Sequence, residues 1–155
     1  MIVETTVAVP PERAFDVFTR ETDLWWRRGP KFRVSGHLPG VLELEPRLGG
    51  QLFETFETRS GGRKTIVVGR VLSWEPPARV LFEWRNVNFA AGEKTEVEVR
   101  FTLTESGNTR VTLEHRGWDA IRADHPARHE KQGRELIAMF GGWWGDQLTA
   151  LRLYV

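Results

Sequence analysis

His115 is the side chain best placed for chemistry. It shares one face of the alternating segment Thr109–Arg116 with Val111 and Leu113, so the alternation predicts an imidazole that faces an apolar interior. A histidine in such a place can orient a ligand or carry a proton. The alternative interpretation is a structural histidine at the end of a strand, hydrogen-bonded to the backbone.

Two further imidazoles have the spacing of metal ligands. His125 and His129 are four residues apart and stand beside Asp124 and Glu130, an arrangement that can hold zinc on a helix. The zinc-protease order His-Glu-x-x-His is absent, however, and Pro126 interrupts the segment. We therefore expect a solvated loop or helix start here, and no metal site.

Charged residues in the predicted strands are candidates for acid-base chemistry. Glu43, Glu54 and Arg70 lie on strands whose inward face the sequence does not assign, so each is a pocket residue or, by default, a solvent-facing one. The chain has no nucleophile elbow, phosphate-binding glycine loop or dinucleotide fingerprint. No catalytic partner is recognisable for the serines Ser35, Ser60, Ser73 and Ser106. We predict no catalytic residue and no cofactor, and an enzyme is the less favoured class.

Aromatic side chains give the strongest indication of a binding site. The chain has seven Trp and nine Phe, with Trp25-Trp26 near one end and Trp143-Trp144 near the other. The two pairs are expected to meet, and there they fill a core or line a pocket, with one ring of each pair facing inward. Phe89, in the loop 86–92, is a candidate gate residue. The predicted cavity residues are Trp25, Trp26, Phe32, Phe53, Trp74, Phe82, Trp84, Phe101, His115, Phe140, Trp143 and Trp144.

The segments before residue 30 must position the first tryptophan pair. Residues 2–9 are rich in β-branched side chains and predict a strand that ends at Pro10-Pro11. A helix then begins at Pro11, because the fixed φ of proline suits the first helical position. Thr22-Asp23 predict the cap of a second, short helix that carries the tryptophans.

Alternation of period two predicts six successive antiparallel strands, separated by turns rich in Gly and Pro. They span residues 41–45, 51–58, 64–74, 79–84, 95–104 and 109–116. Residues 128–153 predict a long helix across the sheet, with an apolar stripe of Leu136, Ile137, Phe140, Trp144, Leu148 and Leu151. Within it, a kink or a close approach is expected at Gly141, Gly142 and Gly145.

Short motifs follow one another in a recognisable order along these elements. They are Val9-Pro10-Pro11-Glu12-Arg13-Ala14-Phe15, Trp25-Trp26, Glu45-Pro46-Arg47-Leu48-Gly49-Gly50, Trp74-Glu75-Pro76-Pro77, Leu81-Phe82-Glu83-Trp84, Glu114-His115-Arg116-Gly117-Trp118 and Gly142-Trp143. In this order the chain resembles the START-like (SRPBCC, helix-grip) superfamily, and within it the bacterial branch related to the activator of heat-shock-protein ATPase.

The resemblance implies an α+β helix-grip fold. In it, a curved antiparallel seven-stranded sheet wraps around a long C-terminal helix, two short helices follow the first strand, and a cavity lies between sheet and helix. Members of the superfamily include lipid carriers, hormone receptors, polyketide aromatases and cyclases, and co-chaperone domains. The resemblance therefore implies a cavity without implying one activity.

Composition limits the partners and the location. The length predicts a single domain, residues 1–155, and a net charge of +1 gives no footprint for nucleic acid. The absence of Cys excludes disulfides and fits a reducing compartment. No signal peptide or membrane-spanning stretch is recognisable, so we expect a cytoplasmic protein without membrane insertion, as a monomer or homodimer. The excess of Arg over Lys suits a GC-rich bacterial genome.

These features predict a protein that binds a hydrophobic or amphipathic small molecule. Burial of apolar ligand surface would drive binding, and His115 or Arg70 would set the orientation of the ligand. Two alternatives remain open. One is an interaction module that regulates a chaperone or another ATPase, and the other is an enzyme of the aromatase or cyclase kind.

Overall fold

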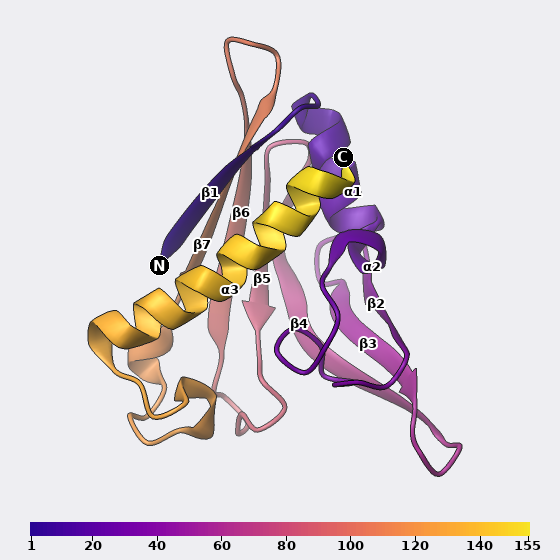
Figure 1. The fold of residues 1–155 in the computed structure, drawn as a ribbon, viewed down its shortest axis with the longest axis vertical. Helices are drawn as coiled ribbons and strands as arrows, with labels where there is room; N and C mark the ends of the chain where they lie inside the picture. Colours follow the sequence, from indigo (N-terminus) through magenta and orange to yellow (C-terminus); the bar gives the residue numbers. More distant parts are fainter.

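A curved antiparallel sheet with a long helix lying across it forms the protein, and the computed structural model describes residues 1–155 (Figure 1). The sheet has seven strands in the order β1-β7-β6-β5-β4-β3-β2. The strands are β1 (Ile2–Val7), β2 (Gly40–Leu44), β3 (Gln51–Glu57), β4 (Arg63–Glu75), β5 (Arg79–Trp84), β6 (Thr95–Leu103) and β7 (Thr109–Arg116). The helices are α1 (Pro11–Arg20), α2 (Thr22–Trp25) and α3 (Gly133–Tyr154), with short 3-10 turns η1 (Trp118–Ala120) and η2 (Pro126–Arg128). The predicted helix-grip fold is confirmed.

Strand pairing decides which side chains face the helix. Strands β2 to β7 pair in sequence order, whereas β1 pairs with β7, so α1 and α2 must lead the chain from one edge of the sheet to the other. Phe82 stands opposite Val97, and Val97 opposite His115, so these three side chains form one row on the same face. That row is buried, because α3 and the two short helices cover this face.

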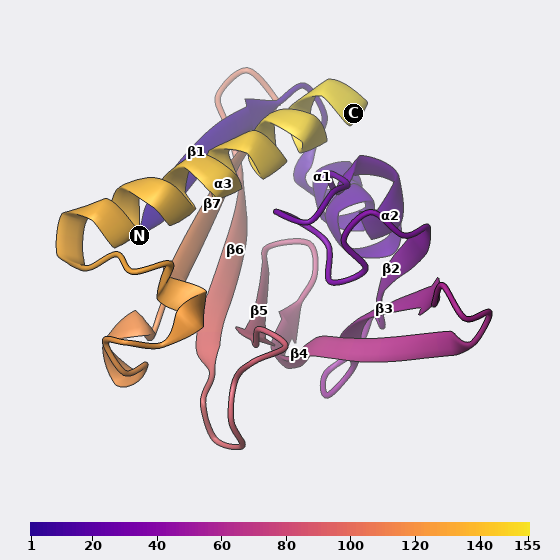
Figure 2. The same ribbon diagram turned by 60° about the horizontal axis from the view of Figure 1, so that its bottom comes forward.

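Irregular pairing along β4 bends the sheet. The register of β3 against β4 shifts between Leu52 and Phe53, and that of β4 against β5 shifts between Val71 and Ser73. Between these points, a Cβ atom on Gly69 would stand 1.6 Å from the carbonyl oxygen of Glu83, so only glycine permits this approach of β4 to β5. Figure 2 shows the result, since β4 runs across the direction of β6 and leaves a hollow side for α3.

The N-terminal elements differ from the predictions in two details. Strand β1 ends at Val7 rather than at Val9, while α1 begins at Pro11 as predicted. Thr22 does not cap α2, because its hydroxyl donates back to the carbonyl of Phe18 at 2.9 Å. The bounds of the other six strands agree with the predictions to within one residue at each end.

Helix α3 covers the hollow face of the sheet. Its buried apolar residues are Leu136, Phe140, Trp144, Leu148 and Leu151, whereas the predicted inward residue Ile137 is 53% exposed. The helix is continuous, and no atom lies within 4 Å of a Cβ built on any of its three central glycines. The close approach predicted at Gly141, Gly142 and Gly145 is therefore wrong.

The start of α3 also differs from the prediction. The helix begins at Gly133 and not at Arg128, because His129 and Glu130 have left-handed φ values of 50° and 61°. Arg128 belongs to the preceding turn, where its guanidinium donates to the carbonyls of Trp118 and Ile121 at 2.6 and 2.9 Å. These tertiary hydrogen bonds hold Arg128 in the turn η2, which ends before the helix begins.

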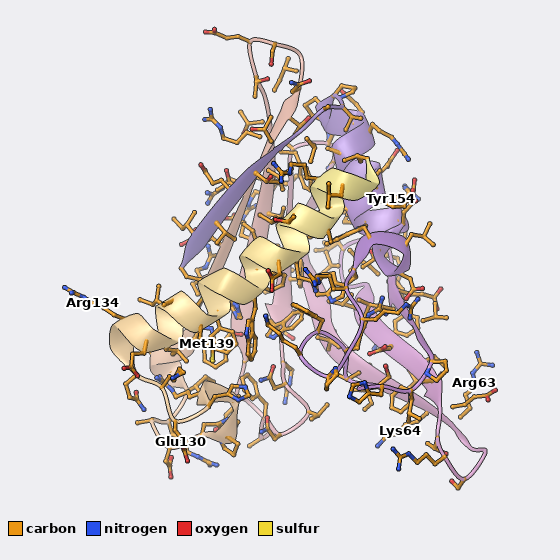
Figure 3. The ribbon with its side chains drawn as sticks, in the orientation of Figure 1. Arg63, Lys64, Glu130, Arg134, Met139 and Tyr154 are labelled. Carbon is orange, nitrogen blue, oxygen red and sulfur yellow. The ribbon has the colours of Figure 1, made fainter.

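Buried apolar side chains form two clusters. The larger one lies between the sheet, α1, α2 and the C-terminal half of α3. The smaller one consists of Phe89, Trp118, Ile121, Ala127, Leu136 and Phe140. Met139 packs against the smaller cluster, and Figure 3 labels it in the N-terminal half of α3. Neither α3 nor any other helix has an apolar stretch long enough to cross a bilayer.

Candidate ligand-binding cavity

A cavity of about 580 Å³ lies between the hollow face of the sheet and α3. Its wall is formed by residues of β2, β3, β4, β5, β7 and α3, together with the segment 26–36, the loop 85–88 and the turn 126–129. The bend at β4 and the smaller second cluster hold the sheet and the helix apart at this place. The cavity therefore results from the curvature of the sheet.

Three tryptophans form the aromatic part of the cavity wall. The rings of Trp26 and Trp84 are stacked with their centroids 5.9 Å apart, and Trp144 meets both edge-on, at 5.7 and 5.3 Å. The indole N–H of Trp26 donates to the carbonyl of Phe32 at 3.0 Å, which fixes the ring. The predicted meeting of the two tryptophan pairs is confirmed, because Trp26 comes from the first pair and Trp144 from the second.

The two pairs differ in how their other member is used. Trp25 faces the core, where its ring lies 5.1 Å from Phe18 and its N–H donates to the carbonyl of Val17. Trp143, by contrast, lines the cavity together with Trp144, so the expectation that one ring of each pair faces inward is wrong for this pair. Trp143 can do so because it lies half-buried at the mouth, with the ammonium group of Lys31 5.7 Å from its ring centroid.

Five residues of the predicted cavity set lie away from the cavity. They are Trp25, Phe53, Trp74, Phe82 and Phe101. Phe53 points to the opposite face of β3 from Leu52 and Glu54, which both line the cavity. The rings of Trp74 and Phe101 pack on Phe15 of α1 at 5.0 and 5.3 Å. Phe82, 1% exposed, belongs to the same larger cluster. The remaining predicted residues, Trp26, Phe32, Trp84, His115, Phe140, Trp143 and Trp144, line the cavity.

His115 lines the cavity but is fully hydrogen-bonded. Because an indole N–H can only donate, the Trp144 N–H at 3.0 Å makes His115 Nδ1 an acceptor. The ring proton therefore lies on Nε2, which donates to the hydroxyl of Thr95 at 2.7 Å, and that hydroxyl donates to the carbonyl of Trp84. Burial, aided by the positive charge of the amino terminus, lowers the pKa of His115 from 6.5 to about 3.

Glu54 is a buried carboxylate in the cavity wall. It is 1% exposed and accepts hydrogen bonds from the hydroxyl and backbone N–H of Ser35, at 2.8 and 3.2 Å. The guanidinium of Arg33, whose side chain is 1% exposed, lies 3.6 Å away. Ser35, for which the sequence indicates no catalytic partner, thus has a structural partner in Glu54. Glu43 and Arg70, the other two charged candidates, are exposed and take no part in the cavity.

Arg33 is held by a second carboxylate outside the cavity. It donates to Asp23 at 2.7 Å and to the carbonyls of Arg27 and Trp26. Desolvation raises the pKa of Asp23, but the backbone N–H of Leu42 and the charge of Arg33 outweigh it, so the pKa is lowered overall. Sequence reasoning did not find Arg33, since an arginine in an irregular segment has no pattern that indicates burial.

Gln147 is a second functional candidate that sequence reasoning missed. It lines the cavity, is 3% exposed, and its Oε1 accepts from the backbone N–H of Arg27 at 3.0 Å. It lies one helical turn after Trp144, so its inward position could have been read from the stripe on α3. The side-chain Nε2 group donates to no protein atom.

The mouth of the cavity carries solvated basic residues. Lys31 pairs with Asp146 at 2.8 Å, and Arg85 and His129 also line this part. Phe89, the candidate gate residue, does not line the cavity. It is buried in the smaller cluster, with its ring edge-on to His125 at 5.0 Å.

His125 serves the structure of the turn that precedes α3. Its Nδ1 accepts from the backbone N–H of Ala127 at 3.0 Å, and its Nε2 lies 3.2 Å from both the Asn88 carbonyl and Glu93. His125 is buried whereas His129 is exposed, so the two imidazoles do not share a face. No group of three or more His, Cys, Asp and Glu residues has a geometry that could hold a metal ion.

Solved structures with the same fold have low sequence identity to this chain. An HSP90 activator from Plasmodium falciparum is 20% identical with a TM-score of 0.64, and the match covers 99% of this chain and 93% of that one. A protein from Mesorhizobium loti is 18% identical with a TM-score of 0.63, covering 99% and 94%. One from Nitrosomonas europaea is 16% identical with a TM-score of 0.61, covering 99% and 92%. These similarities show the fold alone.

The family is shown by the sequence itself. None of the curated proteins compared with it matches. The model of the family described as "Activator of Hsp90 ATPase homolog 1-like protein" matches residues 8–152, a range that includes β2 to β7 and nearly all of α3. The chain therefore belongs to the family of activator of Hsp90 ATPase homolog 1-like proteins, within the START-like superfamily.

Proposed function

We propose that this protein binds a hydrophobic or amphipathic small molecule in the cavity between the sheet and α3, residues 1–155 acting as one cytoplasmic ligand-binding domain. The observation that supports this proposal is the cavity with its aromatic wall. Its volume of about 580 Å³ lies within the range of about 300–1,000 Å³ typical of small-molecule sites. The rings of Trp26, Trp84 and Trp144 supply a rigid apolar surface for a ligand.

The expected driving force is burial of apolar ligand surface. A ligand that buries about 200 Å² of apolar surface would gain about 5 kcal/mol before the costs of lost translation and rotation. The wall needs little reorganisation for this, because the indoles of Trp26 and Trp144 are already fixed by hydrogen bonds. Binding is thus proposed to occur in a preformed site.

His115 supports binding without catalysis. Both of its ring nitrogens are used, one by Trp144 and one by Thr95, and its lowered pKa keeps it neutral near pH 7. A proton carrier needs a pKa near the working pH and a free nitrogen. His115 therefore acts as a support for the Trp144 ring, and the aromatase or cyclase alternative loses His115 as a proton carrier, which leaves Glu54 as a titratable group in the cavity wall.

A cavity-filling variant tests the proposed function. Val68 faces the cavity from β4, whereas the next residue, Val67, is 45% exposed on the other face. We expect the neutral dye Nile red to bind the wild type and Val67→Trp with enhanced fluorescence, and to bind Val68→Trp at least about tenfold more weakly. Circular dichroism checks that each variant is folded. Equal binding by folded Val68→Trp and Val67→Trp would place the dye elsewhere and refute the proposal.

A second candidate function is regulation of an Hsp90 ATPase. It is supported by the family match and by the Plasmodium falciparum structure, which is described as an HSP90 activator. The test is the rate of ATP hydrolysis by a purified bacterial Hsp90 with and without this protein. A stimulation that Val68→Trp retains would separate this function from the cavity, whereas an unchanged rate counts against it.

A further inference from the structure

The side-chain amide of Gln147 has a hydrogen-bond donor that the protein does not use. Its Oε1 is fixed toward the backbone N–H of Arg27, which leaves the Nε2 group without a protein acceptor. The only fully enclosed side-chain donor or acceptor without a partner is Trp118 Nε1, so Gln147 Nε2 must touch open space. Because Gln147 is 3% exposed and lines the cavity, that space is the cavity.

The charges near Gln147 are already compensated. Arg33 donates to Asp23 and to the carbonyls of Arg27 and Trp26, and its guanidinium also faces Glu54. Arg33 is therefore not free to pair with a ligand anion buried beside Gln147, and Glu54 would repel that anion. Arg85, a lining arginine without a carboxylate partner, is half-buried on the loop 85–88 and donates to the carbonyl of Ala90. Lys31, at the mouth, is exposed and paired with Asp146, so it cannot compensate a charge deep in the cavity.

We propose that the cavity selects a ligand whose buried polar group is an uncharged acceptor, such as the carbonyl oxygen of an aryl ketone. This inference rests on the proposed binding function. The ligand oxygen accepts from Gln147 Nε2, and the ring attached to it lies against Trp144, one turn earlier on the same face of α3. An unpaired amide donor in the wall would favour such a ligand over a hydrocarbon of the same shape.

The test uses three naphthalene probes of similar shape. They are 2-acetylnaphthalene, its hydrocarbon analogue 2-isopropenylnaphthalene, and 2-naphthoate at pH 7, each measured by calorimetric titration against wild type, Gln147→Leu and Gln51→Leu. Gln51 is the matched control, because it lies on β3 outside the cavity wall. We expect Gln147→Leu to weaken binding of the ketone by a factor about three to ten times larger than the factor for the hydrocarbon. Gln51→Leu should leave the dissociation constants of both the ketone and the hydrocarbon unchanged. The wild type should bind naphthoate more weakly than the ketone.

The outcomes separate this inference from the proposed function. If hydrocarbon and ketone bind the wild type but lose the same factor in Gln147→Leu, the donor role is refuted while the cavity function stands. Naphthoate binding as tightly as the ketone would overturn the uncharged ligand class. If no probe binds the wild type, the proposed function fails as well. A measurement on the wild type alone guards against misfolding of the variant: the Gln147 side-chain amide proton resonances should shift with the ketone and not with the hydrocarbon.

Discussion

Arg33 is a charged side chain placed where solvent does not reach it. Its role is to hold the segment 26–36 against β2 and β3, since it joins Asp23 on α2 to Glu54 on β3. A buried ion pair contributes little net stability, but removal of one partner leaves the others uncompensated. The cavity wall on this side therefore depends on one guanidinium.

Arg33→Met should lower the free energy of unfolding by about 3–5 kcal/mol, because buried Glu54 loses its only cation and Asp23 keeps only the exposed Arg28. The matched control is Arg28→Met. Arg28 also pairs with Asp23, at 2.9 Å, but its side chain is 59% exposed, so we expect a loss below about 1 kcal/mol. Urea unfolding of both variants measures the difference. Similar losses of unfolding free energy in Arg33→Met and Arg28→Met would show that burial of the Arg33 ion pair does not affect stability.

His115 makes stability depend on pH. Its folded pKa of about 3 is below the usual 6.5, so between these values the unfolded state binds the extra proton and stability falls as the pH is lowered. One pKa unit corresponds to about 1.4 kcal/mol, so we expect a loss of about 2 kcal/mol between about pH 6.5 and about pH 5. His115→Gln, which keeps a donor and an acceptor, should flatten this dependence in urea unfolding. An unchanged slope would assign it to other groups.

At the scale of single residues, types and spacing predicted the site only in part. Alternation placed His115 on the inner face, and its apolar neighbours on β7 were sufficient for that. The burial of Arg33 and Gln147 was not predicted, because it depends on partners distant in sequence. These partners are Glu54 for Arg33 and the Arg27 backbone for Gln147. Alternation and helical spacing predict apolar faces, but they carry no information on such distant partners.

At the scale of elements, glycines have opposite roles in α3 and β4. Gly142 is exposed in the helix, and a Cβ atom added there would meet open space. A Cβ atom added to Gly69 would collide with the backbone of β5. Gly142→Ala should raise the free energy of unfolding by about 0.5–1 kcal/mol, since alanine loses less backbone entropy. Gly69→Ala should lower it and shift the melting temperature down, because β4 and β5 must separate. Scanning calorimetry of both variants tests this, and shifts of the same sign would contradict it.

Strand bounds were predictable wherever turn residues enclose an alternating run. Strands β5 and β7 agree with the prediction to the residue, because proline and glycine turns bound them. The start of α3 was not predictable, since hydrogen bonds from Arg128 to distant carbonyls determine where the preceding turn ends. Local patterns thus define elements, and tertiary contacts define their ends.

At the scale of the whole molecule, acidic and basic side chains are balanced. The net charge is +1, and the outer face of the sheet pairs its arginines with carboxylates, as Arg79, Arg100 and Arg116 do around Glu98. Arg63 and Lys64 project from the far end of the β3–β4 hairpin (Figure 3), away from the cavity. The pairing around Glu98 thus compensates the arginine charges on this part of the outer face.

This charge balance predicts that the protein does not bind nucleic acid at physiological salt. Fluorescence anisotropy of a labelled DNA duplex should stay unchanged on addition of micromolar protein. The variant Glu98→Gln is an informative comparison, because it frees arginine charge on the outer face. Salt-sensitive binding by the wild type would show that the paired arginines are available to phosphates.

The three indoles that meet at the cavity also give the protein a reporter of its own state. Trp26, Trp84 and Trp144 lie within 6 Å of one another and form part of the wall. A molecule entering the cavity would change the polarity around their excited states and quench or shift their emission. Occupancy can therefore be followed by ultraviolet excitation of the unlabelled, purified protein, before the identity of the natural occupant is known.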